Sequence, residues 1–235
     1  MPNPKVSVII PAANEEKCLK ETLDSLGSQT YPDIEIIVSV NGSKDRTLEI
    51  AQKYTQKALN FPSPLTPSKA RNEGAKIAAG EILLFLDADT QLSANAIEKI
   101  VEITARFPAA AGTCLAKIKE KNFRSKLLFG IKNLIHRLNL YKGFTDGVLF
   151  CKKDLFLKVK GFDPEKKVAE FHDFMLRARN FGVLYKFLAN CYVVTSARRF
   201  EKQGYLKTIL FWLKWKIGSL ITKKDKIAKE YKDIR

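Results

Sequence analysis

Two carboxylates, Asp87 and Asp89, directly follow a run of apolar residues at positions 82–86. Such a run, preceded by Gly80, is typical of a strand that is buried on both faces of a parallel sheet. Open α/β sheets bind their ligands at the carboxyl ends of such strands, and paired carboxylates there suit Mg²⁺ or Mn²⁺ shared with a diphosphate. The alternative is a polar turn that only leads into a helix cap.

The elements that would position these carboxylates alternate between strand and helix through the first 105 residues. The predicted strands are residues 6–10, 34–40 and 82–86, and the predicted helices are residues 15–28, 45–56, 69–79 and 93–105. Ser93 is the expected cap of the last helix, and the Pro-rich residues 57–67 are expected to form a loop. This alternation predicts an α/β fold with a mostly parallel sheet, flanked by helices and joined by right-handed crossovers.

The second half of the chain is less regular. Its predicted strands are residues 110–118, 183–187 and 192–195, with one more short strand within residues 145–151. Its predicted helices are residues 123–141, 153–159 and 171–180. No internal repeat and no long linker divides the 235 residues, so we expect one α/β domain with appendages.

Four motifs lie in order along the chain, each at a predicted strand end or helix start. They are VSVIIPAANEE at 6–16, NGSKDRT at 41–47, SKARNEG at 68–74 and LFLDAD at 84–89. Further short motifs follow, namely DG at 146–147, GFD at 161–163, HD at 172–173 and TSARR at 195–199. With these motifs the chain resembles a family-2 glycosyltransferase with the GT-A fold, a Rossmann-like sheet, over about residues 5–215.

The resemblance implies how the chain is divided and which residues bind a nucleotide-sugar donor. Residues 1–200 would form the GT-A domain, with a nucleotide-binding half at 1–105 and an acceptor half at 106–200, and residues 201–235 a basic, amphipathic C-terminal segment. The implied nucleotide-sugar-binding residues are Pro11, Ala12, Asn14, Glu15, Asn41, Arg71, Asp87, Ala88, Asp89, Asp146, Arg198 and Arg199. Asp87 and Asp89 would also hold Mn²⁺ or Mg²⁺, which neutralises the leaving nucleoside diphosphate.

Several of these positions have a structural alternative. Arg71 could lie on a solvated helix face instead of approaching the base or a phosphate. Arg198 and Arg199 could form a basic surface turn instead of clamping a phosphate. Asp45 and Thr47, within the second motif, are expected to cap the next helix rather than to bind the base.

The catalytic base is implied by the pair at residues 172–173. An inverting transferase needs a carboxylate that deprotonates the acceptor hydroxyl, and the resemblance gives this role to Asp173. His172 replaces the usual Glu of the pair, and Glu170 lies close by. The alternative is that Asp173 only stabilises the first turn of a helix through the helix dipole.

The second motif departs from the family pattern at its first position. The family usually has an acidic residue where this chain has Val40, so no carboxylate is available there to accept from a pyrimidine N–H. Asn41 could still accept through its amide oxygen, without a charge. A uridine donor is therefore in doubt, and a guanosine donor is open.

The net charge of +16 is concentrated in two segments. Residues 117–142 hold eight Lys or Arg and one Glu, and residues 198–235 hold twelve Lys or Arg and four Asp or Glu. Each segment also has an apolar stripe, at 123–141 and at 205–221, and the second includes Trp212 and Trp215 and is followed by a Lys-rich tail. Such segments suit an anionic membrane interface, and core or oligomer packing is the alternative for both.

The sequence therefore predicts a metal-dependent, inverting glycosyltransferase that takes a nucleotide-diphosphate sugar and a hydroxyl acceptor, which could be lipid-linked. No apolar run reaches 18 residues, no signal peptide is evident, and the four scattered cysteines suit buried thiols in a reducing cytoplasm. We expect a location at the inner face of the cytoplasmic membrane. The alternatives are a catalytically silent sugar-nucleotide- or membrane-binding protein, and a nucleic-acid-binding protein, for which no recognition motif is present.

Overall fold

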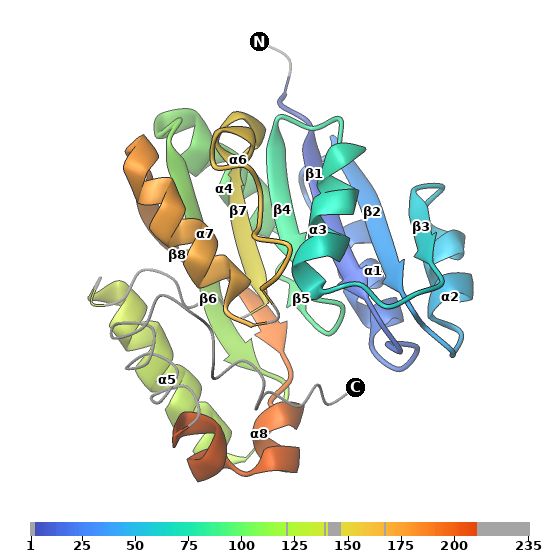
Figure 1. The fold of residues 1–235 in the computed structure, drawn as a ribbon. Helices are drawn as coiled ribbons and strands as arrows, with labels where there is room; N and C mark the ends of the chain where they lie inside the picture. The colour runs from blue at the N-terminus through green and yellow to red at the C-terminus, as the bar shows by residue number, and fades with distance from the viewer. Residues whose placement is uncertain (1–2, 121, 139, 141–146, 167, 211–235) are drawn as a thin grey trace.

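The computed structural model describes residues 3–120, 122–138, 140, 147–166 and 168–210, and its strands form one eight-stranded sheet (Figure 1). The strand order is β3-β2-β1-β4-β7-β6-β8-β5. The strands are β1 (Val6–Ala12), β2 (Ile34–Asn41), β3 (Ala58–Phe61), β4 (Ile82–Leu86), β5 (Gln91–Leu92), β6 (Ala110–Ile118), β7 (Val148–Lys152) and β8 (Leu184–Thr195). Parallel pairing joins β3, β2, β1 and β4, and also β6 to β8, whereas β7 and β5 pair antiparallel with their neighbours.

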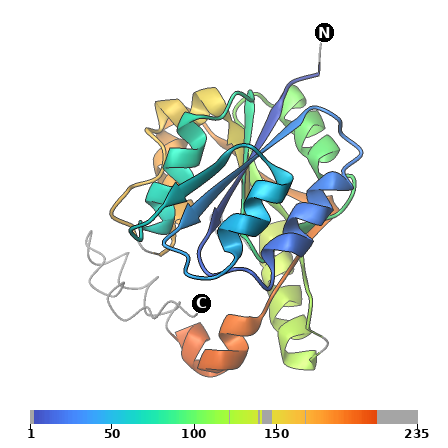
Figure 2. The ribbon, with the colours of Figure 1, turned by 90° about the vertical axis from the view of Figure 1, so that its right-hand side faces the viewer.

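Helices cover both faces of this sheet (Figures 1 and 2). The helices are α1 (Leu19–Gly27), α2 (Thr47–Tyr54), α3 (Pro67–Lys76), α4 (Ala96–Arg106), α5 (Phe123–Arg137), α6 (Lys153–Lys158), α7 (Glu170–Ala178) and α8 (Arg198–Gln203), with a 3-10 turn η1 (Arg179–Phe181). One face carries α1, α2 and α4, and the other carries α3, α6 and α7. The predicted α/β fold with a mostly parallel sheet and flanking helices is confirmed.

The strand that precedes Asp87 is buried on both faces, as the apolar run predicts. All five residues of β4 are buried. Leu84 packs into the core under α1, α2 and α4, whereas Leu83 and Phe85 pack under α3, α6 and α7. Because successive side chains of a strand point to opposite faces, this burial fixes the direction in which the chain leaves β4.

Three predicted boundaries are wrong. The Pro-rich residues 57–67 contain the edge strand β3, which pairs with β2 before the first of the prolines. The two strands predicted at 183–187 and 192–195 are one strand, β8, because a bulge opposite Cys114 and Leu115 absorbs the residues between them. The short strand β5 is absent from the prediction.

Ser93 is not the cap of α4. The N-cap is Asn95, which makes no capping hydrogen bond through its side chain. The hydroxyl of Ser93 donates to Asn95 Oδ1 and accepts from the backbone N–H of Tyr192. Ser93 therefore connects the start of α4 to β8.

Most of the apolar stripe predicted at residues 123–141 lies outside the core where the structure describes it, although Leu128 of this stripe is partly buried against the core. Phe123, Leu127, Ile131, Leu134 and Leu138 are all exposed, although Phe129 on the opposite side of α5 is buried. The second stripe, 205–221, is described only as far as residue 210, where residues 205–210 are helical. Within the described residues, no helix has the length and apolarity that a membrane crossing needs.

Candidate active site

The loops that follow β1 and β2 are tied together beside the end of β4. Asn14 has a left-handed backbone (φ 53°), its N–H donates to Ser43 Oγ (3.0 Å), and its side chain accepts from Lys44 N–H (2.9 Å). The N–H of Glu15 donates to Thr47 Oγ1 (2.8 Å). These contacts hold the predicted nucleoside loop, residues 11–15, against the predicted base-pocket turn.

Asp45 and Thr47 contribute to the same connection. Asp45 accepts from the N–H of Thr47 at the start of α2 (3.0 Å) and from the N–H of Glu16 (3.1 Å). Burial alone raises the pKa of Asp45, but the hydrogen bonds from Thr47 and from the Glu16 backbone lower it overall. Asp45 therefore stabilises the start of α2, as expected, and also anchors the loop after β1.

The backbone of the Asp-Ala-Asp turn is held by hydrogen bonds to two neighbouring segments. The N–H of Asp87 donates to the carbonyl of Gly147 (2.8 Å), and the carbonyl of Ala88 accepts from Thr22 Oγ1 (2.8 Å). Gly147 has φ +80°, and a Cβ there would lie 2.3 Å from Thr90 Oγ1. A side chain at residue 147 would therefore displace the turn that positions both carboxylates.

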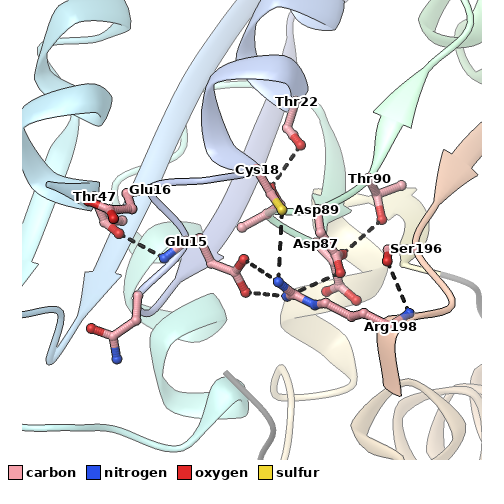
Figure 3. A network of polar contacts seen from close by, with 12 residues as sticks. Glu15, Glu16, Cys18, Thr22, Thr47, Asp87, Asp89, Thr90, Ser196 and Arg198 are labelled. Atoms are coloured by element: carbon pink, nitrogen blue, oxygen red, sulfur yellow. Dashed lines mark hydrogen bonds and ion pairs between the residues drawn. The ribbon is translucent and has the colours of Figure 1, made fainter. Parts of the chain in front are cut away.

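Arg198 connects both carboxylate-bearing loops (Figure 3). Its guanidinium donates twice to Glu15, with Nη1–Oε2 at 3.0 Å and Nη2–Oε1 at 2.6 Å, and Nη2 lies 3.2 Å from Asp89 Oδ2. The Glu15 side chain is only 6% exposed. The interpretation of Arg198 as part of a surface turn is therefore wrong, because its guanidinium neutralises a buried carboxylate beside Asp89.

The surroundings of Arg198 favour its charged form. Burial alone lowers the pKa of Arg198, but hydrogen bonds to Glu15 and the charge of Asp89 raise it overall. Cys18 lies beside the cluster, with Sγ 3.8 Å from Arg198 Nη1, and burial raises the pKa of its thiol. The thiol is therefore neutral at pH 7 and adds no charge to the cluster.

Arg71 links the other aspartate to α7. Its Nη2 lies 2.5 Å from Asp87 Oδ1, and its Nη1 lies 2.6 Å from Glu170 Oε1. The guanidinium also lies over the ring of Phe171, 4.6 Å from the centroid. Because Arg71 is only 3% exposed, the interpretation as a solvated helix face is wrong.

The two carboxylates of α7 are in different surroundings. Asp173 accepts from Arg177 Nε (2.9 Å), and Arg177 also donates to the carbonyls of Val159 (2.6 Å) and Gly161 (2.8 Å) at the end of α6. Glu170 instead reaches Asp87 through Arg71. The catalytic role of Asp173 stays a prediction. The ion pair between Glu170 and Arg71 could not be predicted from the sequence, because these residues are 99 positions apart in the chain.

The remaining predicted site residues are placed as follows. Pro11 and Ala12 end β1, and Ala12 is buried. The Asn41 amide donates to the Leu65 carbonyl (2.8 Å) and accepts from the Leu65 N–H (2.5 Å), so it holds the loop after β3. Asp146 and the side chain of Arg199 lie outside the described residues.

The chemistry of the donor set fits a hard divalent cation. Asp87 and Asp89 offer carboxylate oxygens at the end of a buried strand, with 38% and 17% of their side chains exposed. Among the described residues, no group of three His, Cys, Asp or Glu is arranged to hold a metal. Two carboxylates suit Mg²⁺ or Mn²⁺ when substrate phosphates and water complete the coordination.

A mostly parallel sheet with Asp-Ala-Asp after its central β4 defines the GT-A class, as the sequence predicts. Residues 7–158 match the family "Glycosyl transferase family 2". The chain therefore belongs to glycosyltransferase family 2.

Three proteins of known activity are similar to this chain. Poly(ribitol-phosphate) β-N-acetylglucosaminyltransferase TarS of Staphylococcus aureus is 38% identical over 101 residues, which cover 40% of this chain and 18% of TarS. A crystal structure of TarS residues 1–349 with UDP-GlcNAc matches with a TM-score of 0.65 at 24% identity, over 81% of this chain and 58% of that one. Mannosyltransferase PcManGT of Pyrobaculum calidifontis, in complex with GDP-Man and Mn²⁺, matches with a TM-score of 0.67 at 21% identity, over 81% and 56%.

The third relative aligns with this chain over more residues than TarS does. It is GalNAc(5)-diNAcBac-PP-undecaprenol β-1,3-glucosyltransferase of Campylobacter jejuni, 32% identical over 172 residues, which cover 69% of this chain and 56% of the relative. The chain thus matches less than two thirds of the length of each of these relatives.

Proposed function

We propose that this chain transfers a sugar from a nucleoside-diphosphate donor to a hydroxyl acceptor. The observation that carries the proposal is the convergence of Asp87, Asp89, Arg71 and Arg198 beside the ends of β1, β2 and β4. Carboxylates for a cation and arginines for phosphate are what a departing diphosphate needs. The UDP-GlcNAc and GDP-Man complexes of TarS and PcManGT support the same donor class.

Each side chain has a distinct part in this reaction. Asp87 and Asp89 would hold Mn²⁺ or Mg²⁺, and the metal would supply neutralisation of the diphosphate when the glycosidic bond breaks. Arg198 would bind phosphate oxygens through its planar fork, because it already lies within 3.2 Å of Asp89. Arg71 would keep Asp87 oriented, since it is buried and bonded to that carboxylate.

The nucleoside would lie in the loops after β1 and β2. Asn14 and Glu15 fix the first loop, and Asn41 fixes the loop after β3. The Asn41 amide is hydrogen-bonded to the backbone of Leu65 through both its oxygen and its nitrogen. Asn41 would therefore shape the wall of the base pocket. TarS and PcManGT were crystallised with a uridine and a guanosine donor respectively, so both bases are compatible with this fold.

For inversion at the anomeric carbon, a carboxylate must accept the proton of the acceptor hydroxyl. The resemblance gives this role of catalytic base to Asp173, whereas the geometry favours Glu170 as the base. Glu170 joins the Asp87 cluster through Arg71, whereas Asp173 is held by Arg177 towards the end of α6. We therefore place the base on α7 and give Glu170 precedence.

The acceptor is proposed to be lipid-linked, in line with the undecaprenol-linked acceptor in the name of the Campylobacter jejuni relative. The enzyme would then work at the inner face of the cytoplasmic membrane, held there in part by residues 205–235. Trp212 and Trp215, the aromatic residues of that segment, lie outside the described residues.

The first experiment tests the carboxylates. Asp89→Asn keeps the size of the side chain but weakens its hold on a cation, so release of nucleoside diphosphate should fall by at least about 10²-fold. Asp154→Asn, an exposed change at the start of α6, serves as the matched control and should leave turnover unchanged. Full turnover by folded Asp89→Asn protein would refute the site, and donor binding without turnover by the unmodified chain would favour a silent binding protein.

The second experiment separates the two candidate bases. Glu170→Gln should lower transfer by about 10²-fold or more, because an amide cannot accept the proton. Asp173→Asn should mainly lower stability, by about 1 kcal/mol, since it breaks the pair with Arg177. The opposite pattern, with transfer lost only in Asp173→Asn, would assign the base to Asp173.

A further inference from the structure

Helix α5 exposes an apolar face that the sheet does not use. Five residues, Phe123, Leu127, Ile131, Leu134 and Leu138, are between 48% and 76% exposed. At 3.6 residues per turn these positions fall within about 80° of one another around the helix axis. The opposite side of α5 is buried through Ser125, Phe129 and His136. The exposed face is therefore a continuous stripe, which we call the α5 face.

Basic side chains border this stripe. Arg124 follows one edge, and Lys126 and Arg137 follow the other, all exposed. No acidic residue lies between Phe123 and Arg137. An apolar stripe with cationic borders is the pattern of a helix that lies in the interface of an anionic bilayer, with its apolar side chains below the headgroups and its cations among them.

The same charges argue against a second copy of this chain as the occupant. A two-fold symmetric contact through the α5 face would bring the basic borders of both copies together. Such like charges repel one another, whereas anionic headgroups attract each cation. Charge complementarity therefore favours lipid over self-association.

Helix α8 lies beside one end of α5 (Figures 1 and 2). The rings of Phe129 and Phe200 are 6.3 Å apart, edge to face, and Asn122 Nδ2 donates to Glu201 Oε1 (2.9 Å). These two contacts join α5 to α8, and α8 begins at Arg198. Helix α5 therefore packs against α8, the helix whose first residue, Arg198, lies next to Asp89.

We propose that the α5 face is a membrane-docking surface, which inserts its stripe into a bilayer containing anionic lipid. The inference deepens the proposed function and rests on it for the lipid-linked acceptor, but the docking itself requires no turnover. It assigns a partner, an anionic lipid surface, to residues 123–138. The chain would then dock on the membrane through two regions, the α5 face and the C-terminal segment.

The test is co-sedimentation of the full chain with sucrose-loaded vesicles. Vesicles of phosphatidylcholine with phosphatidylglycerol should bind the protein, and phosphatidylcholine alone should bind it weakly. The double variant Leu127→Ser/Leu134→Ser should lower the partition coefficient by at least about tenfold, because two side chains leave the apolar layer. The matched control, Leu157→Ser/Leu176→Ser, changes exposed leucines on α6 and α7 and should bind like the unmodified chain.

Two further sets of variants separate the contribution of the basic side chains from that of the C-terminal segment. Arg124→Gln/Lys126→Gln should weaken binding at about 50 mM salt and much less at about 500 mM, where charges are screened. Trp212→Ala/Trp215→Ala removes apolar contacts of the C-terminal segment, and the two leucine substitutions should weaken binding further in that background. All changed α5 side chains are exposed, so the variants should melt within about 2 °C of the unmodified chain, as surface substitutions usually do.

Several outcomes would overturn the proposal. Binding of the Leu127→Ser/Leu134→Ser variant equal to that of the unmodified chain would do so, as would equal losses in the α6 and α7 control. Dimerisation in analytical ultracentrifugation that the same two substitutions abolish would assign the face to a second copy instead. Release of nucleoside diphosphate in lipid-free buffer is measured separately, so a failed enzyme and a failed docking surface are distinguished.

Discussion

At the scale of single residues, each aspartate of the Asp-Ala-Asp turn is paired with an arginine from a distant part of the chain. Arg71 bonds to Asp87, and Arg198 lies between Asp89 and Glu15. Glu15 and Arg71 are buried, so removing Arg198 leaves the charge of Glu15 without this partner, whereas Arg71 has two acidic partners, Asp87 and Glu170. Under the proposed function, a diphosphate would compete with these carboxylates for the guanidinium of Arg198, and donor binding would then depend on the position of Arg198.

This arrangement gives a prediction for Arg198. Arg198→Gln should lower the free energy of unfolding by about 1–3 kcal/mol, because Glu15 loses its charged partner. Adding Glu15→Gln should restore part of this stability, since the buried charge is then gone, but nucleotide binding should stay weak in both variants. Urea denaturation and isothermal titration calorimetry would measure the two quantities.

The control for this double-mutant cycle is Arg46→Gln. Arg46 pairs with Glu16 at 3.4 Å but is 76% exposed, so its loss should change stability by less than about 1 kcal/mol. Additive effects of Glu15→Gln and Arg198→Gln on stability would contradict the coupling between these two side chains.

At the scale of elements, Glu35 joins three segments near the amino ends of β1 and β2, whereas Asp87 follows the carboxyl end of β4. Its carboxylate accepts from Ser7 Oγ (2.5 Å), from the N–H groups of Ala79 (2.5 Å) and Gly80 (3.0 Å), and from Lys57 Nζ (2.5 Å). These bonds hold the connection between α3 and β4, and β4 delivers Asp87. Burial raises the pKa of Glu35, but the bonds from Lys57, Ser7 and Ala79 lower it overall.

The pH dependence of stability follows from this lowered pKa. A carboxyl group whose pKa is lower in the folded state stabilises the fold above its unfolded pKa of about 4.3, and this contribution disappears as the pH falls through the folded pKa. Glu35→Gln should therefore lower the free energy of unfolding by about 1–2 kcal/mol at pH 7, with a smaller difference near pH 3.5. Urea titrations at several pH values would measure this difference, and the control Glu49→Gln, in an exposed pair with Lys53, should leave the free energy of unfolding unchanged.

Elements with a strong apolar signal could be predicted from the sequence, and elements that depend on distant contacts could not. The buried strands β1, β2, β4 and β6 were predictable, because both faces of each contribute apolar residues to the core. The edge strand β3 and the two-residue β5 were missed, since pairing with one neighbour, not burial, defines them. Apolar residues at helical spacing occur both on buried helix faces and on exposed ones. The spacing of the α5 stripe therefore could not show that this face is exposed.

At the scale of the whole molecule, the sheet brings residues from all parts of the chain to one edge. The position of the Asp-Ala-Asp turn was predictable, because an apolar run that ends in carboxylates predicts a buried strand whose carboxyl end lies at the ligand-binding edge of an open sheet. The ion pairs were not, since Arg71 and Glu170 are 99 residues apart, and Arg198 and Glu15 are 183 apart. Only the strand order β2-β1-β4, together with α7 and α8, brings these groups within hydrogen-bonding distance.

Because the site joins segments from both ends of the chain, ligand binding there should stabilise the entire fold. A nucleoside diphosphate with Mn²⁺ at about 100 times its dissociation constant adds about 2.7 kcal/mol to the free energy of unfolding. For a chain of this length, about 2–4 °C per kcal/mol gives an increase in Tm of about 5–10 °C. The increase should be larger for GDP or UDP than for the matching monophosphate, since Arg198 and the metal both act on the diphosphate. Chelation with EDTA, or Asp89→Asn, should remove most of it in differential scanning fluorimetry, and equal increases with and without Mn²⁺ would contradict the metal assignment of Asp87 and Asp89.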